Sequence, residues 1–260
     1  MKKDSSYDAR FSEILGGGEY EDLLIALDYY NAFQAETGKA LKGYIQEYCR
    51  NLKTVKVLEA GPGTGIKTLE LLKADPRVMV VAVDNEIKML EVVKSRFATI
   101  SELKDRVEFV YADILKFLES SEDNSYDVFA SVYTLHNFTP DFRRKVINLI
   151  AKKIKPGGIF INGDKYAQGG EAHKKDFNAE IKNYSKFIVV AKEMEKQGNI
   201  KRANHLRQIE KEWIHHAGED EKNKITVDEQ DQIFKELGFS NVKWGKRYDL
   251  VTTVTAVRKI

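Results

Sequence analysis

Short β-rich segments alternate with longer helical patterns over the middle of the chain. The segment from Val78 to Val83 is apolar throughout, as is typical of a strand that is covered by helices on both faces of its sheet. This alternation predicts an α/β fold in which helices wrap a parallel sheet. The expected strands span residues 54–60, 78–83, 107–111, 126–132 and 159–162.

The C-terminal part of this pattern predicts turns and a hairpin. A turn is expected at 155–158, where a proline precedes two glycines. A helix over residues 227–237 is expected to end at Gly238, a residue type at which helices often stop. Two more strands, 241–244 and 249–257, are separated by a gap of hairpin length, so we expect them to be antiparallel neighbours.

Two segments lie outside the expected sheet. Residues 1–50 are expected to form a helical N-terminal cap, and residues 51–260 the main domain. A helical insertion at about 165–225 is expected to interrupt this domain. Because the insertion has apolar faces, we expect it to pack against the domain or against a second subunit, as in a homodimer.

Composition narrows the class of protein. The length of 260 residues suits one domain with an insertion. The 42 basic residues nearly balance the 40 acidic ones, and this balance argues against a protein that coats nucleic acid. Cys49 is the only cysteine, which excludes an internal disulfide and a cysteine-based metal cluster. No apolar run approaches the roughly 20 residues of a membrane helix, and the N-terminus lacks the apolar stretch of a signal peptide. We therefore expect a soluble, cytoplasmic protein.

The sequence VLEAGPGTG, from Val57 to Gly65, joins an expected buried strand to the start of a helix. Its glycines follow the pattern G-x-G-x-G, whereas a dinucleotide fingerprint would need a glycine at the position of Ile66. The glycine spacing and G-K-S/T of a phosphate-binding loop are also absent. Glycines let the backbone approach a ligand closely, and a helix N-terminus offers free N–H groups. The turn therefore points to a nucleotide-like cofactor.

This turn resembles the first motif of the class I S-adenosylmethionine-dependent methyltransferases, which places an acidic residue two positions before G-x-G-x-G. The stretch from Glu59 to Gly65 matches that motif. Three further matches stand at the ends of the second, third and fourth expected strands, at Asp84, Asp113 and 131–133. The resemblance covers about residues 55–162 and implies a Rossmann-like sheet and an S-adenosylmethionine cofactor. In open α/β sheets, ligands bind outside the carboxyl ends of the strands.

The resemblance implies a role for each matching position. The carboxylate of Asp84 would accept hydrogen bonds from the ribose hydroxyls, and Asp113 would accept one from the adenine amino group. The glycine turn would lie against the amino-acid tail, and Glu59 would face its ammonium. Tyr133, after the fourth strand, would lie on the substrate side. The implied cofactor-contacting residues are Glu59, Gly61, Pro62, Gly63, Gly65, Asp84, Asn85, Met89, Asp113, Ile114, Ser131 and Val132.

Several of these positions also have a purely structural interpretation. Asp113 is equally expected as a helix N-cap, Glu59 as the partner of a nearby lysine, and Met89 as a core residue. His136 is either a general base facing the substrate or a polar residue that is satisfied at the cofactor edge. The histidines at positions 205, 215 and 216 lack the spacing of a metal site, so we expect no metal.

The chain also resembles the carboxy-S-adenosylmethionine synthase group, which has the same fold and makes a carboxylated cofactor for tRNA wobble-uridine modification. The likeness rests on residues 201–204 and 238–239 and on the ends of the middle strands. The arginine that holds the extra carboxylate in that group aligns with His215, and an asparagine after strand four becomes Val132. Both differences count against a carboxylated ligand. The likeness further implies that Tyr30 covers the cofactor as a lid.

We therefore expect an enzyme that transfers a methyl group to a small-molecule acceptor by direct displacement, a reaction that depends mainly on alignment. One alternative is a carboxy-S-adenosylmethionine synthase-like or tRNA-modifying enzyme of the same fold. Another is a non-catalytic protein that binds the cofactor. An RNA substrate is not excluded, but no aromatic stacking platform is apparent in the sequence, so nucleic acid is not the favoured partner.

Overall fold

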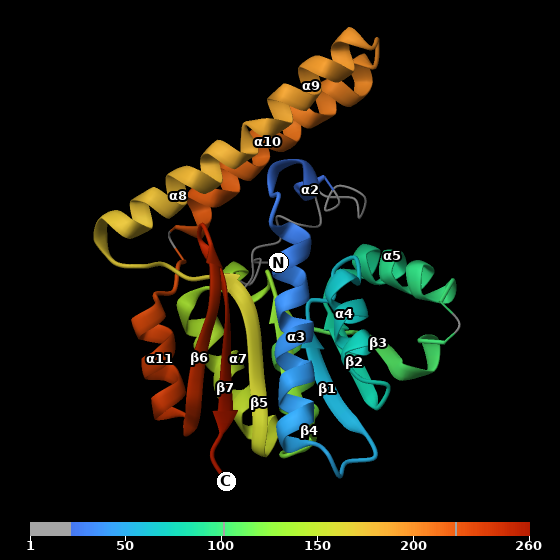
Figure 1. Ribbon diagram of the computed structural model, residues 1–260, viewed down its shortest axis with the longest axis vertical. Coiled ribbons are helices and arrows are strands. Elements are labelled where there is room, and N and C mark those ends of the chain that lie inside the picture. Colours follow the sequence, from blue (N-terminus) through green and yellow to red (C-terminus); the bar gives the residue numbers. More distant parts are fainter. Residues whose placement is uncertain (1–21, 101, 222) are drawn as a thin grey trace, which may run out of the picture.

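A computed structural model describes residues 22–100, 102–221 and 223–260 of the chain (Figure 1). Its strands form one sheet in the order β3-β2-β1-β4-β5-β7-β6. Strands β1 to β5 run parallel, and β7 pairs antiparallel with both β5 and β6. The prediction of a Rossmann-like, seven-stranded, mostly parallel sheet with an antiparallel C-terminal hairpin is confirmed. The strands are β1 (Val55–Ala60), β2 (Val78–Asp84), β3 (Val107–Tyr111), β4 (Tyr126–Val132), β5 (Ile154–Lys165), β6 (Phe239–Tyr248) and β7 (Val251–Arg258).

Helices cover both faces of this sheet. On one face, α3, α4 and α5 bury a cluster that includes Leu41 and Leu90. On the other face, α6, α7 and α11 bury a cluster that includes Leu118 and Phe234. No helix in the described ranges is long and apolar enough to cross a membrane. The helices are α2 (Leu23–Ala26), α3 (Tyr30–Tyr48), α4 (Ile66–Ala74), α5 (Ile87–Ala98), α6 (Ile114–Ser120), α7 (Pro140–Lys153), α8 (Gly170–Tyr184), α9 (Lys186–Lys196), α10 (Ile200–Asp220) and α11 (Val227–Glu236), with the 3-10 turns η1 (Lys104–Arg106) and η2 (Leu135–Asn137).

The order of the strands places a crevice between β1 and β4. Strands β2 and β3 lie on one side of β1, and β4 and β5 lie on the other, so the direction of winding changes at this point. In a parallel sheet, such a switch opens a crevice outside the carboxyl ends of the two strands. Helices α2, α8 and α10 lie beyond this edge of the sheet (Figure 1).

Strand β5 begins earlier than the sequence pattern predicts. The expected turn at 155–158 lies inside the strand, which starts at Ile154. The pairing of β4 with β5 shifts between Tyr126 and Val128, and this irregularity accommodates the extra residues. A Cβ atom at Gly158 would lie 2.7 Å from the carbonyl oxygen of Asp127, so the glycine permits close contact between strands rather than a chain reversal.

The C-terminal hairpin turns later than expected. Strand β6 continues through the predicted gap at 245–248, with shifted pairing to β7, and ends at Tyr248. The reversal lies at Asp249 and Leu250, where Asp249 has a φ of 50°. Aspartate tolerates this left-handed conformation better than most residues, which explains why the chain can turn here without glycine.

The helices outside the sheet form two distinct groups. Helix α3 packs on α4 and β5 as part of the sheet's own helical layer. Helices α2, α8, α9 and α10 instead share a separate apolar cluster that includes Leu27, Phe187 and Trp213. The hairpin of α9 and α10 projects away from the sheet (Figure 1). Residues 1–21 of the expected N-terminal cap lie outside the described part of the chain.

Two glycines of α3 provide a test of how this helix packs. A Cβ atom at Gly38 would lie 2.9 Å from the carbonyl oxygen of Glu70 in α4, whereas one at Gly43 would meet nothing within 4 Å. We expect Gly38→Ala to destabilise the fold by about 1–3 kcal/mol through overpacking. Gly43→Ala should stabilise it by about 0.5–1 kcal/mol, because alanine favours the helix. Urea denaturation of both variants checks this, and equal effects would contradict the packing of α3 on α4.

Candidate active site

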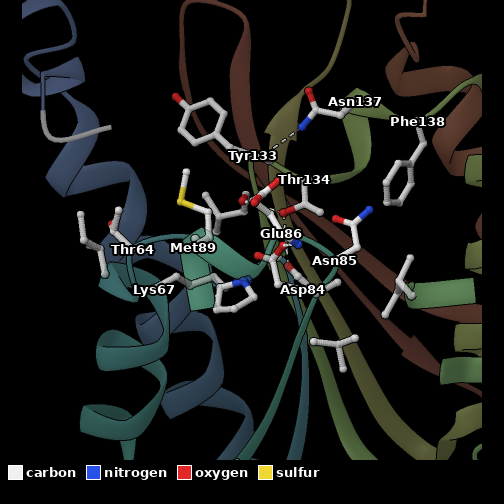
Figure 2. Close-up of a pocket in the computed structure, with 18 of the residues that line it drawn as sticks. Thr64, Lys67, Asp84, Asn85, Glu86, Met89, Tyr133, Thr134, Asn137 and Phe138 are labelled. Atoms are coloured by element: carbon white, nitrogen blue, oxygen red, sulfur yellow. Dashed lines mark hydrogen bonds between the residues drawn. The ribbon is translucent and has the colours of Figure 1, made fainter. Parts of the chain in front are cut away.

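A cavity of about 960 Å³ opens at the carboxyl ends of β1, β2 and β4 (Figure 2). It occupies the crevice that the strand order predicts. Its walls come from α3, from the turns that follow β1 to β4, and from the start of α7. The residues that line it are Tyr30, Gln34, Ala60, Gly61, Pro62, Gly63, Thr64, Ile66, Lys67, Val83, Asp84, Asn85, Glu86, Met89, Ala112, Asp113, Ile114, Val132, Tyr133, Thr134, Asn137, Phe138 and Phe142.

The glycine turn after β1 forms the floor of this cavity. Gly61, Gly63 and Gly65 have φ values of 64°, 54° and 84°, a conformation that side chains with a Cβ atom rarely adopt. A Cβ atom at Gly61 would lie 2.4 Å from the hydroxyl oxygen of Thr134. Gly63 faces open space, whereas Gly65 caps α4, packs against Val93 and does not line the cavity.

Asp84 presents a half-buried carboxylate to the cavity from the end of β2. Its Oδ1 accepts a hydrogen bond of 2.9 Å from the backbone N–H of Glu86. Burial raises the pKa of Asp84 from 3.8 to about 6, although hydrogen bonds from the backbone of Glu86 and Gly63 oppose the shift. Asn85 lines the cavity beside it, as the sequence analysis expects.

Asp113 is a helix N-cap that also lines the cavity, and its contact with an adenine stays a prediction. It is the N-cap of α6, where its Oδ1 accepts a hydrogen bond of 3.0 Å from the backbone N–H of Lys116. Its side chain also belongs to the cavity wall, together with Ile114 and Met89. Met89 packs against the core with 4% of its surface exposed, so it is both a core residue and part of the wall.

Glu59 lies beneath the cavity rather than in its wall. It is fully buried, and its Oε1 lies 3.4 Å from Nζ of Lys67, which does line the cavity. Burial raises the pKa of Glu59 and lowers that of Lys67, and the mutual attraction of the pair opposes both shifts. Of the two interpretations in the sequence analysis, this geometry matches the lysine partner, and the contact with an ammonium stays a prediction.

The end of β4 presents Val132 and Tyr133 to the cavity, whereas Ser131 is buried within the strand and does not line it. Tyr133 has a φ of 52°, which is uncommon for an aromatic residue. Its ring stacks on Tyr30 with centroids 6.0 Å apart and meets the edge of Phe33 at 5.1 Å. Tyr30 lines the cavity beside Tyr133, and its role as a lid stays a prediction.

Several lining residues have no counterpart in the sequence analysis, among them Thr64, Lys67, Glu86, Thr134, Asn137 and Phe138 (Figure 2). Thr64 lies inside the glycine motif, and Lys67 and Glu86 follow recognised positions closely, so their nearness in sequence is a usable signal. Thr134, Asn137 and Phe138 depend on the path of the chain after β4, where η2 folds back so that Nδ2 of Asn137 donates to the carbonyl oxygen of Tyr133 at 3.4 Å. A short loop of this kind has no periodic pattern that would reveal it.

A second, smaller cavity of about 320 Å³ lies next to the first. Tyr133 lines both cavities, so its side chain forms part of the wall between them. His136, which the sequence analysis assigns to the substrate side, lines the smaller cavity and not the larger one. The lining residues are Leu23, Leu27, Tyr133, His136, Lys165, Tyr184 and Trp213.

Charged side chains cluster behind this smaller cavity. Nδ1 of His136 lies 2.6 Å from Oδ1 of Asp164, and both residues are buried. Nζ of Lys165 donates to Glu180 at 2.6 Å and to Asp220 at 2.7 Å. Burial lowers the pKa of Lys165, but these two carboxylates outweigh it and hold the pKa above its usual range. Among the described residues, no group of three or more histidines, cysteines and carboxylates is arranged to hold a metal ion.

The raised pKa of Asp84 predicts a cost in stability. Because its folded-state pKa of about 6 exceeds the ordinary 3.8, ionisation of Asp84 destabilises the fold above pH 6. We expect Asp84→Asn to raise the free energy of unfolding at pH 8 by about 1–3 kcal/mol, and the gain to vanish as pH falls below about 4. Thermal melts of the ligand-free protein between pH 4 and 8 measure this. Asp105→Asn, at an exposed carboxylate, is the control, and an equal gain there would contradict the explanation.

The buried pair of Glu59 and Lys67 predicts a non-additive effect. Lys67→Met leaves the Glu59 carboxylate without its cation and should destabilise the fold by about 3–5 kcal/mol. The double variant Glu59→Gln/Lys67→Met removes both charges and should recover most of that loss. Urea denaturation of the two single variants and the double variant tests this, and simple additivity would show that the two charges do not interact.

Comparison with known proteins agrees with this architecture. Residues 57–158 match the family described as "Methyltransferase domain". The chain is 30% identical over 148 residues to phosphoethanolamine N-methyltransferase 1 of Triticum aestivum, a match that covers 55% of this chain and 28% of that protein. It is 29% identical over 110 residues to carboxy-S-adenosyl-L-methionine synthase of Nautilia profundicola, covering 42% of this chain and 44% of that protein. The chain thus spans less than half the length of these two relatives.

A solved structure of the CurJ carbon methyltransferase superposes with a TM-score of 0.65 at 13% identity, over 97% of this chain and 62% of that chain. This likeness concerns the fold alone. The matched segment runs from β1 to the first part of β5 and so includes the glycine turn, Asp84, Asp113 and Tyr133. Residues 57–158 therefore match a methyltransferase domain, and the sheet that contains them has the Rossmann-like methyltransferase fold.

Proposed function

We propose that this protein transfers the methyl group of S-adenosylmethionine to a small-molecule acceptor by direct displacement. The observation that carries the proposal is the pair of adjacent cavities that share Tyr133 at the end of β4. The larger cavity would hold the cofactor and the smaller one the acceptor. Methyl transfer requires the two reactants to be held in contact, which adjacent cavities with one common wall allow.

The residues of the larger cavity suit the cofactor's parts. Asp84 offers a half-buried carboxylate to a ribose diol, and Asp113 offers a carboxylate to an adenine amino group. The open space above Gly63 leaves room for an amino-acid tail. Nζ of Lys67 has no well-formed hydrogen bond within the described part of the chain, so it is placed to bind the carboxylate of that tail.

The apolar and aromatic lining of the smaller cavity supports a small acceptor over a nucleic acid. Leu23 of α2, Tyr184 of α8 and Trp213 of α10 contribute to this lining. A carboxylated cofactor finds less support, because His215, where the related synthases carry an arginine, is exposed on α10. Val132, the other departure from that group, is an apolar residue in the wall of the larger cavity.

The chain's own residues supply alignment and a proton acceptor. Bound S-adenosylmethionine would supply a methyl carbon that a nucleophile can attack, with the sulfur leaving as a neutral thioether. Asp164 would accept from Nδ1 of His136, which leaves Nε2, 4.0 Å from Oδ2 of Asp220, as the nitrogen that would take up a proton. His136 lines the smaller cavity and would accept the proton that the acceptor loses.

Calorimetric titration with S-adenosylhomocysteine tests the cofactor site. We expect binding by the unaltered protein to weaken as pH falls through about 6, because protonation of Asp84 removes the acceptor for the ribose hydroxyls. Asp84→Asn should weaken binding at pH 8 by at least about tenfold, since hydrogen bonds to a charged group contribute about 1.5–3 kcal/mol. The affinity of that variant should vary little over the same pH range.

Transfer of a radiolabelled methyl group to the low-mass fraction of a cell extract tests catalysis. His136→Gln should lower this transfer while leaving the affinity for S-adenosylhomocysteine unchanged, because His136 does not line the larger cavity. Asp105→Asn is the control for both measurements. Absence of binding by the folded protein, or transfer only to macromolecules, would refute the proposal.

A further inference from the structure

The walls of the smaller cavity combine aromatic rings with apolar side chains. Tyr133, Tyr184 and Trp213 contribute the rings, and Leu23 of α2 and Leu27 just after it contribute the apolar side chains. The rings of Tyr184 and Trp213 are stacked, with centroids 5.9 Å apart and planes inclined by 23°. Faces of aromatic rings attract cations, above all where water is excluded. The cavity therefore suits a ligand that has an apolar part and a positive charge.

The charges around the cavity have an acidic excess. Its lining contains Lys165 and His136, and the carboxylates of Asp164, Glu180 and Asp220 contact these two side chains. With Lys165 charged and His136 neutral, three carboxylates against one ammonium leave a formal charge of −2; a protonated His136 leaves −1. Buried Arg143 interacts electrostatically with Asp164 and Asp220 and offsets one further charge, so the wider cluster is acidic while His136 is neutral.

One of these carboxylates has unused bonding capacity. Glu180 is 1% exposed, and its Oε1 accepts hydrogen bonds from Lys165 and from the hydroxyl of Tyr184, each at 2.6 Å. Its Oε2 is buried and finds no hydrogen-bond partner among the described residues. Both donors to Oε1 line the cavity, which places this carboxylate directly behind the wall. A buried carboxylate in an acidic cluster is stabilised by a nearby positive charge.

We propose that the acceptor bound in the smaller cavity is an amine: a small molecule with an apolar part and a primary or secondary amino group that is cationic in water. The proposal rests on the proposed methyltransferase function and names the chemical class of its acceptor. The aromatic walls hold the apolar part and the ammonium, and the acidic cluster supplies the compensating charge.

The methyl-transfer step is consistent with this acidic environment. The ammonium first gives a proton to Nε2 of His136, which leaves a lone pair on nitrogen. That lone pair forms the new N–C bond as the C–S bond breaks, and the pair of electrons from the broken bond stays on sulfur. The positive charge of the sulfonium thus moves to the methylated nitrogen, where the carboxylates stabilise it. An oxyanion or enolate acceptor would instead place a negative charge beside the same three carboxylates.

A matched set of probes tests the charge preference. Benzylamine, benzyl alcohol and benzoate share a ring and differ in charge, and each is titrated calorimetrically into the protein saturated with S-adenosylhomocysteine at pH 7.5. We expect benzylamine to bind at least tenfold more tightly than either of the others. Glu180→Gln should weaken benzylamine binding about tenfold and leave benzyl alcohol binding unchanged. Glu193→Gln, the same replacement at an exposed position of α9, should change neither.

The following outcomes would overturn the assignment of an amine acceptor or the proposed function itself. Equal or tighter binding of benzoate or benzyl alcohol overturns the amine assignment, and so does the absence of benzylamine binding to a protein that binds S-adenosylhomocysteine. Failure to bind S-adenosylhomocysteine instead refutes the proposed function, so the two failures are distinguishable. If Glu180→Gln does not fold, Asp220→Asn removes a different charge of the same cluster, and unchanged benzylamine affinity in that variant overturns the assignment.

Discussion

The close approach of the turn after β1 to the loop after β4 is the constraint on which the site depends. The backbone N–H of Gly61 donates to the carbonyl oxygen of Val83 at 2.9 Å, which ties the turn to the end of β2. The hydroxyl of Thr134 donates to the carbonyl oxygen of Ala60 at 3.2 Å, which ties it to β4. Gly61 leaves no space for a side chain between these two contacts. Three strand ends are therefore held together, and Asp84 and Tyr133 are positioned relative to each other.

Charged side chains with little access to water are concentrated at this edge of the sheet. Asp84, the pair of Glu59 with Lys67, and the cluster around Lys165 all lie where water is scarce, and each is held by specific partners. Such groups stabilise a fold weakly at best, since desolvation offsets much of their attraction. Their concentration around two cavities, rather than in the apolar layers of the sheet, fits the common pattern in which binding sites reduce stability.

The sequence reveals those parts of the structure that depend on local patterns. Strands β3 and β4 begin and end where their apolar runs do, and the glycine motif places the floor of the larger cavity. The sequence pattern places the start of β5 too late, because a proline followed by two glycines is typical of a turn. The true start depends on the pairing of β5 with β4, which is a long-range property of the fold. The contact of Lys165 with Asp220 joins residues 55 positions apart, and no spacing rule anticipates it.

Tyr133 has a further consequence as the wall that the two cavities share. Its ring contacts Tyr30 from α3 on one side and His136 on the other, with centroids 6.0 Å and 6.2 Å apart. If the two cavities hold ligands as proposed, a ligand that shifts this ring in one cavity would alter the free energy of binding in the other. By thermodynamic linkage this influence would be reciprocal and equal in size.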